Sequence, residues 1–385
     1  MKLLIYSWLH EFTLNDIINT FNKIAVQFDL ITLDLFKKDK SNCQELYDKV
    51  YNKLSSCGYD AVFSVNYFPD VAKACFAKNT RYISWTYDCP LDIENISDTI
   101  SLPTNRAFFF DKEQYLEYDN TNNTVYHFPL AVNPLRSQVK YSSDYSSDIS
   151  FVGRIYHSSF PALTKYMNEF NKGYLKGLIE SQKNVYGTYL VKDALSESYL
   201  KDLNKDLKDH NCPFTLGEKS VSLKQIAYSL ATEATFENRL MCLGLLSIYL
   251  DLKWYTTPDS ETLNNIKKYP PVDYDKEMPI VFKSSKINLH IGLHAIPSGI
   301  SLRQLDIMSC GGFLLSSFQP ELFDFFIPGE DFDFFSSPEE ALDKAKFYIS
   351  NESVREKIVR SGTEKTNSIF SYEERIPKLL SLAME

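Results

Sequence analysis

The sequence has little that would place the protein in a membrane or on nucleic acid. No window of the 385 residues approaches the 18 or so apolar residues that a spanning helix requires, and the apolar core of MKLLIYSWLHEF is too short for a signal peptide. Positive charge is also scarce, since 41 Lys and Arg face 50 Asp and Glu, which gives a net charge of −9. This balance leaves no electrostatic footprint for duplex nucleic acid.

Paired cysteines and the common phosphate-binding motifs are missing as well. The seven cysteines are an odd number, lie far apart and contain no C-x-x-C spacing, which argues against a zinc site or a redox pair. An odd number of widely spaced cysteines predicts reduced thiols in a cytoplasmic protein. Because the chain has neither G-x-G-x-x-G nor a Walker P-loop, ordinary dinucleotide-binding and NTPase functions lose support.

Apolar residues are plentiful, at 44% of the chain with 14% aromatic, which is ample for buried cores. A length of 385 residues exceeds what one core usually spans, so two domains are expected. Up to about residue 135, short apolar runs such as KLLIYSW and DAVFSVNYF alternate with stretches of helical periodicity. This βαβα order predicts a parallel sheet with helices on both faces.

The second half repeats this organisation after a polar break. Residues 137–148, SQVKYSSDYSSD, have no apolar period and are expected to link the domains. The strand ISFVGRIY starts a second alternation that runs through INLHIGLH and GGFLLSS, and the serines before Pro338 can cap the helices that follow. We therefore predict two doubly wound α/β domains, over 1–140 and 141–370, with a ligand cleft between their strand ends.

Residues 295–317, AIPSGISLRQLDIMSCGGFLLSS, pack a loop, a helix, a turn and a strand into a short space. Ser301 can cap the helix, and Gly311 and Gly312 can end it. A Gly-containing loop that enters a helix directs backbone N–H groups and the positive end of the helix dipole outward, which suits a diphosphate. A plain crossover between strands explains the pattern equally well. Asp306 favours a binding site, because a carboxylate facing a core is costly, whereas at a cleft edge it can accept both hydroxyls of a ribose.

This stretch resembles a known family. SKINLHIGLHAIPSGISLRQLDIMSCGGFLLSSFQPELFDFFIPGEDFDFF is similar to the C-terminal signature of the CgeB-like, spore-maturation-type glycosyltransferases, a GT-B group. VFSVNYFPDVAKAC, YISWTYDCPL, FFFDKEQY and HFPLAVNP are similar to its N-terminal half, and DISFVGRIY resembles the strand that opens its donor domain. The resemblance implies two Rossmann-like domains, with the nucleotide sugar in the C-terminal one, the acceptor against the N-terminal one, and a last helix, 371–385, that returns to the N-terminal domain.

The resemblance also assigns donor residues. The widespread GT-B donor motif has two acidic residues separated by seven positions; the second matches Asp306, which would hold the ribose, and the first matches Ser298, so the expected acid is missing there. Glu321 is a second candidate for ribose or sugar hydroxyls. Gly299 lies in the same loop, and His294, at the expected strand end, is placed to touch the donor.

Departure of a nucleoside diphosphate requires stabilisation of negative charge. Arg154 comes directly after FVG, where a glycine at a strand end, Gly153, would let the backbone approach a diphosphate, although a surface Arg at a strand end explains it equally well. Arg303 is the second cation expected near the phosphates. Arg239 is the third, since an Arg on a helix is usually just solvated.

The catalytic base has three candidates. An inverting transferase needs a carboxylate or His to take the proton of the acceptor hydroxyl, whereas a retaining one can do without it. Asp88, after the strand RYISWT, is the first candidate, with turn capping as its alternative role. His10 and Glu11, in the loop after the first strand, come next.

Two patterns that resemble metal sites carry less weight. His290 and His294 are four residues apart in a predicted strand, where that spacing does not bring their rings together. Asp331-x-Asp333 resembles the D-x-D of the other main glycosyltransferase fold, but it is more simply a loop that leads into a strand. We expect neither a metal nor a cofactor.

Together these features predict a cytoplasmic, metal-independent hexosyltransferase that uses a nucleotide-diphosphate sugar, with UDP as the first candidate nucleotide. Its acceptor can be a glycan, a protein or a small molecule. The alternative, favoured by Ser298, is a non-catalytic GT-B protein that binds nucleotide or glycan or serves in surface-layer assembly. The donor base and sugar, the acceptor, the anomeric outcome and the oligomeric state stay open.

Overall fold

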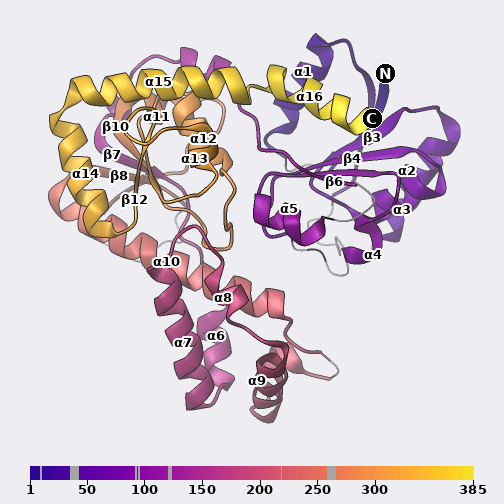
Figure 1. Ribbon diagram of the computed structural model, residues 1–385, viewed down its shortest axis with the longest axis horizontal. Helices are drawn as coiled ribbons and strands as arrows, with labels where there is room; N and C mark the ends of the chain where they lie inside the picture. The colour runs from indigo at the N-terminus through magenta and orange to yellow at the C-terminus, as the bar shows by residue number, and fades with distance from the viewer. Residues whose placement is uncertain are drawn as a thin grey trace. The chain divides into compact units, whose positions relative to one another are not determined.

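The computed structural model describes residues 1–8, 11–34, 43–91, 93, 96–119, 124–217, 219–257 and 266–385. The chain forms two compact units (Figure 1). Unit 1 consists of Met1–Pro134, Gly299–Leu305 and Thr366–Glu385, and unit 2 of Leu135–Ser298 and Asp306–Lys365. Each unit contains one six-stranded sheet in which every pairing is parallel, so the α/β class with two doubly wound sheets is confirmed.

The sheet of unit 1 has the strand order β2-β1-β3-β4-β5-β6. Its central strands are buried along their length, which is why their sequences are nearly continuous apolar runs. The strands are β1 (Lys2–Ser7), β2 (Gln27–Thr32), β3 (Ala61–Val65), β4 (Arg81–Thr86), β5 (Asn105–Phe109) and β6 (Val125–His127).

The helices of unit 1 follow the strands as the sequence predicts. Pro69 begins α3 at a position where its missing N–H is no loss, and Asp111 caps α5 by accepting from the backbone N of Gln114 at 2.8 Å. The helices are α1 (Leu14–Lys23), α2 (Gln44–Ser56), α3 (Pro69–Ala77), α4 (Ser97–Ile100), α5 (Lys112–Tyr118) and the C-terminal α16 (Tyr372–Met384), which packs beside α1 (Figure 1).

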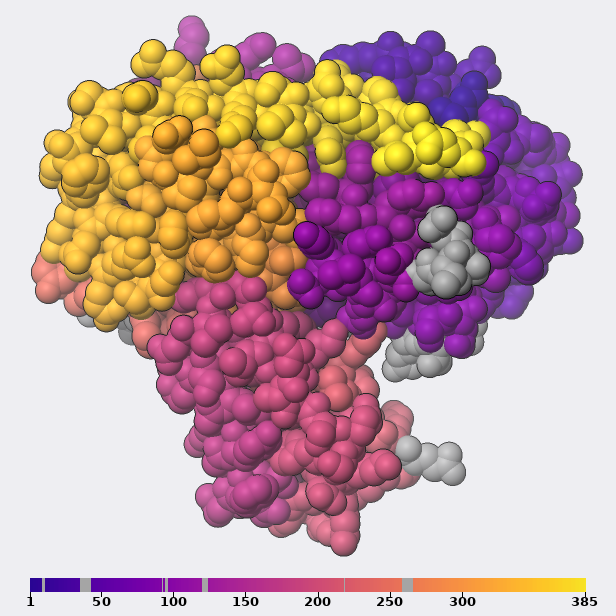
Figure 2. All heavy atoms as spheres, viewed as in Figure 1, coloured from indigo at the N-terminus to yellow at the C-terminus, as the bar shows by residue number. Residues whose placement is uncertain are grey.

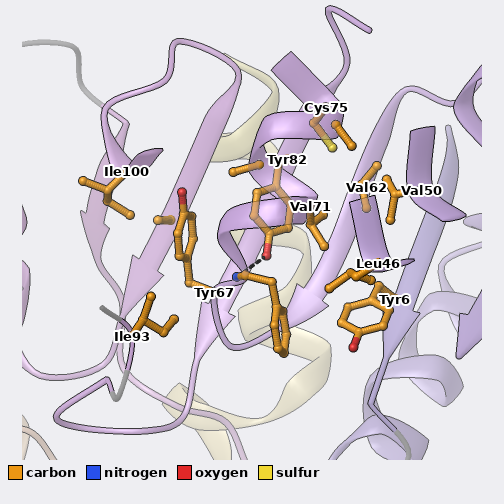
Figure 3. Close-up of a cluster of buried hydrophobic side chains, with 14 of the residues drawn as sticks. Tyr6, Leu46, Val50, Val62, Tyr67, Val71, Cys75, Tyr82, Ile93 and Ile100 are labelled. Atoms are coloured by element: carbon orange, nitrogen blue, oxygen red, sulfur yellow. Dashed lines mark hydrogen bonds between the residues drawn. The ribbon is translucent and has the colours of Figure 1, made fainter. Parts of the chain in front are cut away.

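The core of unit 1 includes a cluster of aliphatic side chains and tyrosines on one face of its sheet (Figure 3). Tyr82 is fully buried there, yet its hydroxyl accepts from the backbone N of Phe68 at 3.0 Å and lies 2.7 Å from Ser64 Oγ. These bonds satisfy the one polar group of a large buried ring. The cluster thereby fixes the strand ends from which the loops after β3 and β4 leave.

The sheet of unit 2 has the order β12-β11-β10-β7-β8-β9. Residues 137–148, expected as a linker, contain the end of the 3-10 turn η1 (Pro134–Gln138), the 3-10 turn η2 (Ser143–Tyr145) and the first residues of β7. The strands are β7 (Ser147–Val152), β8 (Leu252–Tyr255), β9 (Lys267–Tyr269), β10 (Ser285–His290), β11 (Leu314–Ser317) and β12 (Asp333–Phe335).

Helices cover this sheet and also form a separate lobe between β7 and β8. The expected cap and Pro start of α14 are confirmed, because Ser337 Oγ accepts from the backbone N of Glu340 at 3.1 Å and Pro338 is the first helical residue. The helices around the sheet are α10 (Leu223–Tyr249), α11 (Met278–Ser284), α12 (Leu302–Ser309), α13 (Leu322–Phe325), α14 (Pro338–Ser350) and α15 (Glu352–Phe370).

The lobe departs from a simple alternation of helices and strands. The described residues between β7 and β8 form no strand, because their amphipathic helices pack on one another and on α10 around an apolar cluster of their own. Figure 2 shows the lobe, coloured magenta to pink, projecting from the rest of unit 2. Its helical elements are α6 (Phe160–Leu163), η3 (Thr164–Tyr166), α7 (Glu169–Lys183), α8 (Leu190–Asp193), α9 (Glu197–Asp209) and η4 (Pro213–Thr215).

Within the described part of the chain, every helix is too short or too polar to cross a lipid bilayer.

Candidate functional site

The strand before the candidate donor loop is shorter than the sequence predicts. β10 ends at His290, so the expectation that INLHIGLH is strand throughout is wrong for its last four residues. The ladder stops because the carbonyl of Ile291 accepts from Arg239 Nη2 at 2.6 Å and the N–H of Gly292 donates to Ser317 Oγ at 3.0 Å. His294 therefore lies in a turn, not at a strand end.

His294 is enclosed by the protein. Its side chain is 5% exposed, with Gln182 Nε2 3.3 Å from Nδ1 and Asn238 Nδ2 2.8 Å from Nε2. Burial, with a smaller contribution from the Arg239 charge, lowers its pKa to about 4, so the imidazole is neutral at physiological pH. Both ring nitrogens already face amide groups, which fits a role in holding the loop against α7 and α10.

The structure brings together two predicted residues that lie far apart in sequence. Ser298 Oγ donates to Glu321 Oε1 at 2.6 Å, and the backbone N of Glu321 donates to the carbonyl of Ser298 at 3.1 Å. Both side chains are buried, at 6% and 2% exposure. A carboxylate thus lies against the position where the family resemblance places the first donor acid.

Asp306 is buried, at 2% exposure, and has a phenol partner in unit 2. Tyr274 donates its hydroxyl to Asp306 Oδ1 at 3.1 Å. Arg136 lies over the ring of Tyr274, with 4.6 Å from its guanidinium carbon to the ring centroid, and pairs with Asp275 Oδ1 at 2.5 Å. Neither Tyr274, in PVDYDKEM, nor Arg136, in PLRSQ, lies in a sequence motif that would connect it to Asp306.

The three predicted cations differ in their surroundings. Arg154 is exposed at the end of β7. Arg303 is half-buried in the segment Gly299–Leu305. Arg239, expected to be solvated, is only 7% exposed: its guanidinium donates to the carbonyls of Arg154 and Ile291 and lies 4.6 Å from the ring centroid of Tyr156. Arg239 therefore has a structural role, and Arg154 and Arg303 stay the predicted phosphate ligands.

Gly153 lies at the same strand end. Its N–H donates to the carbonyl of Tyr255 at 3.1 Å, and its carbonyl accepts from Trp254 Nε1 at 2.9 Å. A Cβ atom here would meet the ring of Phe151 at 3.5 Å, an ordinary contact. The packing does not itself require glycine, so close approach of a diphosphate stays a prediction.

Gly299 is held by Asp111, a residue that sequence analysis did not single out. Its backbone N–H donates to Asp111 Oδ2 at 2.6 Å, while Oδ1 of the same carboxylate caps α5. A Cβ atom at Gly299 would stand 2.8 Å from Asp111 Cα and 2.9 Å from the Phe110 ring. Glycine is therefore needed for this contact between residues 188 positions apart. The only signal in the sequence is an Asp three residues before Gln114 at a helix start.

Asp88, the first candidate base, lies exposed in the turn after β4. Asn66, which has φ of 63°, holds this turn: its Oδ1 accepts from the backbone N of Tyr87 at 2.7 Å and of Asp88 at 3.1 Å, and its Nδ2 donates to Asp88 Oδ2 at 2.8 Å. Asn66, and not Asp88, therefore caps this turn, and the Asp88 carboxylate accepts a hydrogen bond from the Asn66 amide. Asn tolerates the left-handed conformation better than most residues.

Glu11 has the more unusual carboxylate. Burial raises its pKa from 4.5 to about 7, and the nearby Ser7 side chain and Trp8 backbone offset part of that rise. Neither carboxylate oxygen is in contact with solvent, and no described residue makes a well-formed hydrogen bond to either of them. A carboxylate that titrates near neutral pH suits general-base chemistry. His10, the third candidate, lies outside the described residues.

Both carboxylates of the D-x-D pair form hydrogen bonds and ion pairs with other side chains of unit 2. Asp331 accepts from Lys365 Nζ at 2.9 Å and from Ser361 Oγ at 2.6 Å, and Asp333 accepts from Tyr348 at 2.6 Å and Lys344 at 3.0 Å. Among the residues with a described placement, no three His, Cys, Asp or Glu side chains gather in a way that could hold a metal ion.

Comparison with known proteins agrees with this architecture. Residues 226–381 match the family described as glycosyl transferase-like. No curated protein matches the sequence. Among solved structures, Anabaena HepE in complex with UDP and glucose has a TM-score of 0.52 at 11% identity, with 99% of each chain covered.

Two further glycosyltransferase structures are similar over the whole chain. A glycosyltransferase from Rickettsia africae has a TM-score of 0.55 at 10% identity and covers 99% of this chain and 97% of its own. AviGT4, involved in avilamycin A biosynthesis, has a TM-score of 0.53 at 8% identity, with 100% and 97% covered. The similarity to these structures over the whole chain shows the GT-B fold, and residues 226–381 resemble the glycosyl transferase-like family.

Proposed function

We propose that the protein transfers a hexosyl group from a nucleoside-diphosphate sugar, with UDP as the nucleotide, to an acceptor other than nucleic acid. HepE has been solved with UDP and with UDP-glucose, and an α-glucosyltransferase of similar fold with UDP-glucose and DNA. The UDP or UDP-glucose common to these structures supports this donor class. The proposal includes membership of the CgeB-like group, a cytoplasmic location, and catalysis without a metal or cofactor.

The contact between Ser298 and Glu321 carries the proposal. Ser298 occupies the position of an expected donor acid, and its hydroxyl lies 2.6 Å from the Glu321 carboxylate. Glu321 would thus supply the carboxylate that accepts hydrogen bonds from the sugar hydroxyls, and Asp306 would bind the ribose.

The chemical step breaks the bond between the anomeric carbon and the diphosphate and forms one to the acceptor oxygen. Arg154, Arg303 and the amino end of α12 would stabilise the charge on the departing diphosphate. Glu11 would take the acceptor proton, since its pKa near 7 lets it be both ionised and basic at neutral pH. Asp88 becomes the second choice, because it is exposed and already accepts a hydrogen bond from Asn66.

A thermal-shift panel of UDP-, GDP-, dTDP- and CDP-sugars tests the donor. A ligand at a hundred times its Kd stabilises the folded state by about 2.7 kcal/mol, so the UDP-sugars are expected to raise the unfolding temperature most. Glu321→Gln should weaken that shift, while Asp324→Asn, which alters a carboxylate three residues further on, should leave it unchanged. A panel without any shift would contradict the proposal.

Chelation provides an independent prediction. Because Asp331 and Asp333 are paired with Lys365 and Lys344, neither is available as a D-x-D metal ligand without breaking those pairs. Donor turnover is therefore expected to persist in excess EDTA. Loss of turnover that Mn²⁺ or Mg²⁺ restores would refute the metal-independent mechanism.

The missing acid at Ser298 supports a second candidate, a non-catalytic GT-B protein that binds nucleotide or glycan or serves in surface-layer assembly. The two candidates differ in one measurable property, release of nucleoside diphosphate. Binding of a nucleotide sugar without release, over a range of acceptors, would favour the second.

A further inference from the structure

The lobe of unit 2 carries a groove whose lining contains none of the residues assigned above to the donor or the acceptor. It encloses about 590 Å³ and is lined by α9 and by residues 220–223, which precede and open α10. Asn204 fastens these two walls, since its Nδ2 donates to the carbonyl of Val221 at 2.9 Å and its Oδ1 accepts from the N–H of Val221 at 2.8 Å. The groove is therefore a fixed feature of the lobe.

Three lysines line the groove on one side of α9. Lys201, Lys205 and Lys208 are four and three residues apart, which places them on one helix face with about 6 and 4.5 Å of helix between them. All three are exposed, and none forms an ion pair with a residue in the described ranges. Glu197 and Asp209 also line the groove, at the two ends of the helix, without pairing to these lysines. A row of available cations is notable in a chain of net charge −9.

Exposed apolar side chains follow the C-terminal end of α9. Asp209, the last residue of α9, lines the groove, and a turn that includes Pro213–Thr215 follows it in the chain. Phe214 and Leu216 in this turn are 49% and 59% exposed. The N–H of Cys212 donates to the carbonyl of Leu207 at 2.9 Å, which ties the turn to α9.

We propose that Lys201, Lys205, Lys208, Phe214 and Leu216 form a docking surface for a bilayer that contains anionic phospholipid. The ammonium groups would meet the phosphodiester headgroups, and the two apolar side chains would enter the interface. A lipid surface offers partners to both kinds of side chain, since negative headgroups face the lysines and the bilayer interface accepts the apolar side chains. A soluble acidic polysaccharide would engage the lysines but leave Phe214 and Leu216 in water.

Docking of this kind is reversible and needs no spanning helix. It would bring the protein to lipid-borne or membrane-proximal molecules, and it does not depend on the transfer reaction proposed above. The interaction is electrostatic in part, so it weakens with ionic strength.

Sedimentation with phospholipid vesicles tests the surface. The whole protein is expected to sediment with vesicles of phosphatidylcholine and phosphatidylglycerol at about 0.1 M salt, to stay in solution with phosphatidylcholine alone, and to be released at about 1 M salt. The triple variant Lys201→Gln, Lys205→Gln, Lys208→Gln should lower partitioning about a hundredfold, from the usual contribution of each lysine near an anionic surface. The double variant Phe214→Ser, Leu216→Ser should also lower it.

A control variant with the same net charge distinguishes the effect of removing these lysines from the effect of lowering the net charge of the protein. Lys140, Lys165 and Lys357 are exposed and lie on other parts of the chain, so their triple Gln variant has the same net charge as the groove variant. This control variant should bind anionic vesicles like the wild type. All variants should have the unfolding temperature of the wild type, because every altered side chain is exposed. Three results would overturn the proposal: absence of binding to anionic vesicles, equal binding to neutral ones, or equal loss in control and groove variants.

Discussion

Replacing Glu11 with Gln is expected to lower sugar transfer by roughly 10²- to 10⁴-fold, the usual contribution of a general base, while donor binding is retained. The same change should alter how stability depends on pH. Glu11 has its pKa raised by burial to about 7, so one side chain would determine both the lower pH limit of catalysis and part of the pH dependence of folding.

The sign of each effect follows from the direction of the pKa shift. A base must be ionised to accept a proton, so kcat/KM should rise as pH increases through about 7 and then level off. The folded state holds the Glu11 proton more tightly than the unfolded chain does, because the pKa of Glu11 is 4.5 in the unfolded chain. The stability that Glu11 contributes when protonated is therefore complete below pH 4.5 and is lost as pH rises through 7, up to about 3 kcal/mol.

Urea unfolding at several pH values between 5 and 8 measures the second effect. Wild type should lose stability over this range relative to Glu11→Gln, whose amide does not titrate; the comparison is between slopes, so any fixed effect of the buried amide cancels. Asp88→Asn is the matched control for activity. If Asp88→Asn abolishes transfer and Glu11→Gln leaves it intact, the base is Asp88. If the stabilities of wild type and Glu11→Gln change with pH in the same way, the pKa of Glu11 is not raised in the folded state.

Local signals in the sequence predicted much of the fold. Pro69 and Ser337 mark helix starts, because their backbone and side-chain chemistry acts within one turn of the chain. Apolar periodicity extends the strand over all of INLHIGLH, but its true end depends on Arg239, a residue some fifty positions away whose guanidinium donates to the carbonyl of Ile291. Apolar periodicity cannot detect such a competitor.

In the candidate site, too, single residues can be identified from local sequence, whereas contacts between distant residues cannot. Ser298, Asp306 and Glu321 could be singled out one by one, but the hydrogen bond between Ser298 and Glu321 results from the packing of two loops. Asp111 cannot be found from local signals, because its second contact, to Gly299, joins residues 188 positions apart. Glu11 was ranked below Asp88 because burial, which raises its pKa, is a property of the folded chain and not of the residue type.

Asp306→Asn is expected to weaken binding of the nucleoside diphosphate that gives the largest thermal shift by roughly 10- to 100-fold. That range corresponds to about 1.5 to 3 kcal/mol for hydrogen bonds to a charged group. The substitution keeps the side-chain volume but removes the charge and one acceptor, so a ribose could no longer donate both of its hydroxyls to it. Isothermal titration with wild type and variant measures the change.

Burial of Asp306 against Tyr274 offers a competing explanation, a purely structural carboxylate, and Tyr274→Phe distinguishes the two. This variant removes the hydroxyl that donates to Asp306 Oδ1 at 3.1 Å but keeps the carboxylate. If Asp306 binds ribose, Tyr274→Phe should lower stability by about 1 kcal/mol and retain donor affinity, because the freed acceptor is available to the ligand. If the carboxylate serves only to hold Tyr274, both variants should lose stability and bind donor like the wild type. The ribose contact is then ruled out, and the donor must be bound through Glu321 and the cations alone.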